Sequence, residues 1–222
     1  VTDLVILGDF LDMWRRDIAG VVVENIETMG KLVSLQDKKR VHYVVGNHDH
    51  HMILLRDHSY QFDFRTELVM PQDQRKIRFM HGWQFDPSMN EAYFEALCLT
   101  TDESGAKLNE AFELLTRSWN WLDKRRAKNK ILKDLEEMLK PAEARLRKTA
   151  DIVQNNACRS VEKGEILVFG HTHKAFINEK ENVANTGCWV GATASNTYVE
   201  LSDAKPRLYA FPRQEITDRI NC

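Results

Sequence analysis

Four short apolar segments of this chain each end beside a glycine and a polar side chain, and this pattern restricts the fold most. The segments span residues 3–7, 41–45, 76–80 and 166–169. Runs of this length that end at glycine are typical of buried strands. The pairs that follow them are Gly8-Asp9, Gly46-Asn47, His81-Gly82 and Gly170-His171. Because open α/β sheets place their sites beyond the carboxyl ends of the strands, we expect these polar residues to meet.

The first two apolar segments flank a helical pattern. Between residues 18 and 36, apolar residues recur at spacings of three and four, which marks one face of a helix. Strand, helix and strand in this order predict a βαβ unit with parallel strands. Further strands are predicted at 60–69, 175–178, 183–185, 197–201 and 207–211. The fold class is therefore α/β.

Residues from about 90 to 162 differ from the rest in being rich in helix formers and charge. We interpret residues 88–163 as a helical insertion, a lid, and residues 1–87 and 164–222 as the core domain. The basic run 124–130 fits a solvated helix face, and peripheral contact with an anionic membrane is the alternative.

Composition excludes several classes of protein. The 222 residues are 43% hydrophobic and 29% charged, which is ordinary for a globular chain and excludes extensive disorder. With 31 basic and 33 acidic residues, overall basicity does not favour nucleic-acid binding. Four scattered cysteines without a Cys-x-x-Cys pair favour reduced thiols and a cytoplasmic protein.

The polar residues at the strand ends have the chemistry of a metal site. Imidazole and carboxylate ligands together suit zinc, manganese or iron. A carboxylate can bridge two such ions, and two-metal centres are suited to phosphoryl transfer. His50 and His51, which come just after the second strand end, are expected at the surface, and the alternative is that they face the cleft.

The motifs GDFLD, GNHD, HG and GHTH, in this order from Gly8 to His173, resemble the calcineurin-like metallophosphoesterase family. The resemblance implies a four-layer αββα sandwich of two mixed β-sheets. It also implies a binuclear centre with two divalent ions, Mn²⁺ before Zn²⁺ or Fe. In that family Asp9 would bridge the ions. Asn47, His81 and His171 would complete one ion's site, and His173 would bind the other.

The resemblance also assigns roles around the metals. His48 would be the general acid or a group that contacts phosphate, and Asp12 would orient its ring. Asp49 would support the ligands without binding an ion. The nucleophile would be a water activated by the ions.

One family motif is missing from this sequence. The family opens with Asp-x-His on a strand ahead of the GD motif, and only seven residues precede Gly8. We expect an upstream strand outside this sequence, and the alternative is a chain with an incomplete second metal site.

The expected function is that of a metal-dependent phosphoesterase acting on a phosphomonoester, phosphodiester or pyrophosphate. The insertion and the GDFLDMW segment resemble bacterial UDP-2,3-diacylglucosamine hydrolases, although those enzymes carry Arg where this chain has His48. A lipid pyrophosphatase of that type is one alternative, and a catalytically impaired metal-binding scaffold is another. The expected partner is a phosphorylated small molecule or a lipid-linked substrate. A nuclease is the least favoured alternative.

Overall fold

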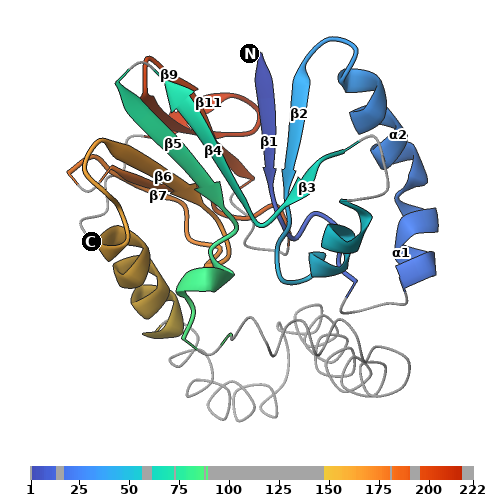
Figure 1. Ribbon diagram of the computed structural model, residues 1–222, viewed down its shortest axis with the longest axis horizontal. Coiled ribbons are helices and arrows are strands. Elements are labelled where there is room, and N and C mark those ends of the chain that lie inside the picture. The colour runs from blue at the N-terminus through green and yellow to red at the C-terminus, as the bar shows by residue number, and fades with distance from the viewer. Residues whose placement is uncertain are drawn as a thin grey trace, which may run out of the picture.

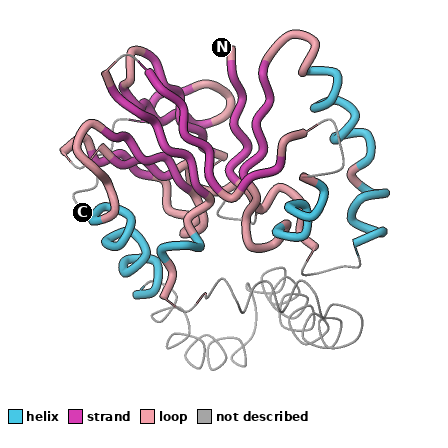
Figure 2. Tube along the Cα trace, viewed as in Figure 1, coloured by secondary structure: helices cyan, strands magenta, loops and turns pink. Residues whose placement is uncertain are grey.

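The computed structural model describes residues 2–13, 18–56, 62–72, 74–87, 89, 148–180, 182–190 and 196–216. Most of the expected insertion, including the basic run 124–130, lies outside the described residues. The described chain forms β-sheets in the middle of the molecule with helices on the two outer sides (Figure 1, Figure 2).

The first sheet is parallel and has the strand order β1-β2-β3. Its strands are β1 (Asp3–Leu7), β2 (Arg40–Val44) and β3 (Phe64–Arg65), and the helices α1 (Ile18–Glu24) and α2 (Ile26–Leu35) join β1 to β2. The predicted βαβ unit is therefore present. The helical stretch predicted for residues 18–36 is confirmed but is divided into two helices. Asn25 separates them with non-helical dihedral angles, and its side-chain amide donates to the Val21 carbonyl at 2.9 Å.

The second sheet is mixed, with the order β4-β5-β6-β8-β7. Its strands are β4 (Glu67–Gln72), β5 (Arg75–Met80), β6 (Glu165–Phe169), β7 (Phe176–Asn178) and β8 (Val183–Asn185). The pairs β5–β6 and β6–β8 are parallel, and the two outer pairs are antiparallel. The strand predicted for residues 60–69 is in fact divided between β3 and β4, and residues 57–61 lie outside the described part.

A third, antiparallel sheet consists of β9 (Thr197–Ser202), β10 (Lys205–Ala210) and β11 (Gln214–Ile216). Neither β11 nor the short 3₁₀ helices η1 (His50–Leu55) and η2 (Trp83–Phe85) were predicted. The α/β class is confirmed, but the described strands form three hydrogen-bonded sheets where two were expected.

The alternation of side chains along the strands separates the core into layers. On β6, Ile166 and Val168 face the strands of the first and third sheets, while Leu167 and Phe169 face the opposite side. On β2, Tyr43 packs against α1 and α2, while Val44 faces the five-stranded sheet. The first sheet and the five-stranded sheet therefore pack face to face, with helices on the outer side of each.

The helix over residues 148–159 packs on the outer face of the five-stranded sheet. Its Val153 and Ala157 are buried with Phe169 and Phe176. These residues belong to the segment expected to form the lid, yet they bury apolar surface in the core. Among the described helices, none is long and apolar enough to cross a membrane.

Candidate metal centre

The carboxyl ends of four strands meet between the first and second sheets. The ends of β1 and β2 face those of β5 and β6, and the arrows of β1 and β5 run toward the same central region (Figure 1). Two hydrogen bonds join the loops there: the Gly170 N–H donates to the His81 carbonyl at 2.8 Å, and His81 Nδ1 donates to the Leu7 carbonyl at 2.5 Å. Residues from both sheets thus form one site.

Two glycines allow the loops to approach this closely. A Cβ at Gly46 would lie 2.2 Å from Asp9 Oδ1 and 2.4 Å from the Asp9 backbone nitrogen. Gly82 has φ +117°, and a Cβ there would lie 2.8 Å from the ring of Phe169. Side chains at either position would push the strand ends apart, which explains why the motifs contain glycine.

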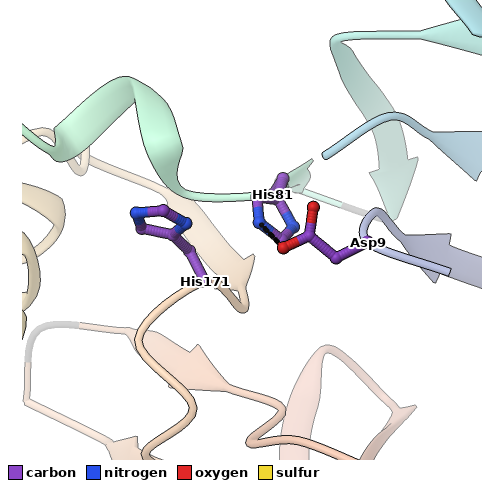
Figure 3. A group of neighbouring side chains, drawn as sticks. All are labelled: Asp9, His81 and His171. Carbon is purple, nitrogen blue, oxygen red and sulfur yellow. Dashed lines mark ion pairs between the residues drawn. The ribbon is translucent and has the colours of Figure 1, made fainter. Parts of the chain in front are cut away.

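Asp9, His81 and His171 each direct one potential ligand atom to a common point. These atoms all lie within 4.8 Å of one another. Asp9 Oδ2 is 3.1 Å from His81 Nε2, and the His171 ring lies beside this ion pair (Figure 3). Asn47 Oδ1 joins the group, at 3.1 Å from His81 Nε2 and 3.0 Å from His171 Nδ1.

In His81 and His171, the ring nitrogen that points away from the group of ligands makes a hydrogen bond of its own. His81 Nδ1 donates to the Leu7 carbonyl, and His171 Nε2 lies 3.2 Å from Asp86 Oδ2. Both partners are acceptors, and a neutral imidazole that donates its one N–H to such an outer partner carries a lone pair on its inward nitrogen. These two nitrogens, with the Asp9 carboxylate and the Asn47 amide oxygen, form a set of converging acceptors that fits a divalent cation.

Charge in the metal-free site is balanced by a proton. Burial lowers the pKa of His81, but the Asp9 carboxylate raises it by more than burial lowers it. The pKa of His81 therefore lies above its ordinary value. Burial raises the pKa of Asp9, but the charge of His81 and its hydrogen bond hold that pKa well below the usual range. Burial and the charge of His81 lower the pKa of His171 to about 4. A bound cation would replace the proton on His81.

His48 and Asp12 form a hydrogen-bonded pair at the edge of this group. His48 Nδ1 is 2.8 Å from Asp12 Oδ1, and the His48 backbone N–H donates to Asp9 Oδ1 at 2.8 Å. Burial lowers the pKa of His48, but the hydrogen bond to Asp12 and the charges of Asp9 and Asp12 raise it above the ordinary value. The imidazole therefore keeps its proton to a higher pH than an ordinary histidine does.

Comparison with known proteins identifies the family. The family model described as calcineurin-like phosphoesterase matches residues 2–175, which is more than half of the chain. The chain belongs to the calcineurin-like phosphoesterase family. Membership of this family supports, in general terms, the predicted hydrolase that acts on phosphoric esters and binds divalent metal.

Other comparisons add less. Among solved structures, Vacuolar Protein Sorting 29 from Cryptosporidium parvum is similar at 19% sequence identity, with a TM-score of 0.35. The similarity covers 86% of this chain and 76% of that protein. A search of curated proteins found no match.

Asp49 holds together the loop that follows β1 and the loop that follows β2. Its buried carboxylate accepts hydrogen bonds from the Gly46 N–H at 2.6 Å, the Phe10 N–H at 2.9 Å and the Tyr43 hydroxyl at 2.7 Å. Burial and the charge of Asp9 raise the pKa of Asp49, while the Tyr43 and Gly46 hydrogen bonds lower it. Asp49 thus supports the loops that carry Asp9 and Asn47.

Not every residue named from the sequence joins the group of ligands. Asp9, Asn47, His81 and His171 come together, and His48 pairs with Asp12. His173 is exposed and is not among the described residues whose ligand atoms lie within 4.8 Å of one another. The expectation that His50 lies at the surface is wrong, because η1 buries it edge-on against Trp83 at 5.7 Å between ring centroids.

Three residues that support the site were missed from the sequence: Tyr43, Asp86 and Asn185. The Asn185 side-chain amide donates to the Gly170 carbonyl at 2.7 Å and to Thr172 Oγ1 at 3.1 Å, which fixes the loop that carries His171. Tyr43, Asp86 and Asn185 reach their partners only in the folded chain, and a single sequence gives no local signal for these contacts.

Proposed function

We propose that this chain is a phosphoesterase that hydrolyses a phosphomonoester, phosphodiester or pyrophosphate of a small molecule or a lipid-linked substrate. The observation that supports this most is the convergence of acceptor atoms from Asp9, Asn47, His81 and His171, with His48 beside them. When bound there, a divalent cation polarises a phosphoryl oxygen and lowers the pKa of water.

The role proposed for His48 is that of general acid. Asp12 accepts the Nδ1 hydrogen bond and fixes the ring, which leaves the Nε2–H as the proton to donate. The raised pKa of His48 keeps this proton in place to a higher pH than in an ordinary histidine. Protonation of the departing alkoxide avoids the release of a strongly basic leaving group.

We further propose that the site binds two divalent ions as a binuclear centre. Asp9 can contribute two oxygens, since Oδ2 faces His81 and Oδ1 accepts from the His48 backbone. His173 would belong to a second ion, and Mn²⁺ is favoured over Zn²⁺ or Fe. Because the described residues contain one group of converging ligands, a metal-binding scaffold without hydrolysis is the second candidate function.

The test compares metal content and turnover in the same preparations. With Mn²⁺ present, we expect the chain to hydrolyse p-nitrophenyl phosphate, bis-p-nitrophenyl phosphate or a nucleoside-diphosphate ester. His48→Ala should lower turnover by about 10²- to 10⁴-fold and leave the metal content unchanged. His81→Ala should lower the metal content as well. His42→Ala is the control, because His42 pairs with Asp3 away from the centre.

Two results would contradict the proposal. Metal binding by the wild-type chain without turnover of any of these esters would favour the scaffold. Equal turnover by His48→Ala and wild type, on esters with both good and poor leaving groups, would refute the acid role.

A further inference from the structure

We propose that Asp86 is a positioning residue, which holds His171 in the one neutral tautomer that can bind a cation within the site. The inference rests on the proposed function only in assuming that this site binds a metal. Asp86 directly follows η2 and is buried, with 6% of its surface exposed. It does not face the converging ligand atoms but lies behind one of them.

The geometry at His171 distinguishes its two nitrogens. Nδ1 lies 3.0 Å from Asn47 Oδ1, inside the group of ligands, while Nε2 lies 3.2 Å from Asp86 Oδ2. A neutral imidazole has a single N–H, and both Asn47 Oδ1 and Asp86 Oδ2 can only accept it. The anionic carboxylate is the stronger acceptor of the two, so Asp86 draws the hydrogen to Nε2 and leaves the lone pair on Nδ1 facing the site. With the hydrogen on Nδ1 instead, His171 would point a donor at the cation.

The segment that carries Asp86 is itself held in place. The Asp86 N–H donates to the Trp83 carbonyl at 3.0 Å, and the Met89 N–H donates to the Asp86 carbonyl at 3.0 Å. From the helix over residues 148–159, the Asn156 side chain donates to the Phe85 carbonyl at 2.9 Å. The carboxylate is thus fixed against His171 by its own turn and by a neighbouring helix.

The two histidine ligands obtain this support in different ways. His81 donates Nδ1–H to a backbone carbonyl, that of Leu7, whereas His171 relies on the side chain of Asp86. A substitution at Asp86 therefore changes the tautomer preference of one ligand and leaves that of the other intact. Removal of such an outer hydrogen-bond partner typically lowers metal affinity by about 10- to 100-fold.

The first measurement is the tautomer itself. Long-range ¹H–¹⁵N NMR spectra of the ¹⁵N-histidine-labelled, metal-free chain at pH 8 should show His171 with its proton on Nε2, assigned by comparison with His171→Gln. In Asp86→Asn, whose amide can donate to Nε2, the His171 signals should shift toward the Nδ1–H form, while those of His81 stay unchanged. A proton on Nδ1 of His171 in the wild-type chain would overturn the inference, even if no Asp86 variant folds.

The second measurement is the affinity for Mn²⁺ alone, by calorimetry. Asp86→Asn should bind Mn²⁺ about 10- to 100-fold more weakly than wild type. Asp37→Asn, which makes the same change at an exposed position, should bind as wild type does. Equal affinity of wild type and Asp86→Asn would overturn the inference whatever the activity. A wild-type chain that binds Mn²⁺ but hydrolyses no ester would refute the proposed function alone, and one that binds no Mn²⁺ would refute both.

Discussion

Tyr43→Phe tests whether the hydrogen bonds to the Asp49 carboxylate stabilise the fold. The Tyr43 side chain is fully buried, and its hydroxyl donates to Asp49 Oδ2 at 2.7 Å. Phenylalanine keeps the ring and its edge contact with Phe64, at 5.0 Å between centroids, so the substitution removes the hydrogen bond and little else. Because Asp49 is also fully buried, water cannot replace the lost donor.

The size of the effect follows from this environment. A hydrogen bond to a charged group contributes about 1.5–3 kcal/mol, and a buried acceptor that loses its donor pays its desolvation cost. We expect Tyr43→Phe to lower the free energy of unfolding by about 2 kcal/mol. In a chain of this length, that corresponds to a decrease in Tm of about 4–8 °C.

The assay is urea unfolding followed by tryptophan fluorescence, with a chelator present so that metal binding does not add to the measured stability. The control is Tyr198→Phe, which removes a hydroxyl from a partly exposed tyrosine that stacks on Tyr209 in the β9–β10 pair. It should change the free energy of unfolding by less than about 0.5 kcal/mol. If Tyr43→Phe is no more destabilising than Tyr198→Phe, the hydrogen bond to Asp49 does not hold the loops together.

Two further predictions concern the same loops. The first is a pH dependence of the metal-free chain: because the pKa of His171 falls from an ordinary 6.5 to about 4, the unfolded chain takes up this proton first as the pH drops. The contribution of His171 to the free energy of unfolding is therefore fully present above pH 6.5 and is lost between pH 6.5 and 4. It amounts to about 3 kcal/mol at 1.36 kcal/mol per pKa unit. Unfolding curves of His171→Gln, measured across this pH range, should lack this loss of stability. The second is a pair of glycine substitutions: Gly46→Ala, whose Cβ would meet the Asp9 backbone, should destabilise the chain by about 3 kcal/mol or more. Gly30→Ala, inside α2 with nothing within 4 Å, should stabilise it by about 0.5–1 kcal/mol. Thermal melts of both variants check the signs, and a neutral Gly46→Ala would show that the loops are not tightly packed.

Local sequence predicted most of the strands because each depends on a short apolar run, and a glycine follows β1, β2, β5 and β6 closely. The strand predicted for residues 183–185 has the observed bounds, and so has β1 at residues 3–7. The helix break at Asn25 was missed because the apolar spacing continues through it, while a side chain bonds to the preceding turn. The short strand β11 was missed because it is exposed and lacks an apolar pattern.

The sequence by itself determined that four polar pairs follow strands, and the order of these pairs indicated the family. The pairs are Gly8-Asp9, Gly46-Asn47, His81-Gly82 and Gly170-His171. Only the tertiary structure decided which atoms of those residues face one another and which other side chains hold them in position. Asp86 contacts His171 across 85 positions of the chain, and Tyr43 reaches Asp49 through a hydroxyl that is buried only when the sheet is complete. Strand formation depends on neighbours in sequence, whereas such contacts depend on which strands pair and how the sheets pack.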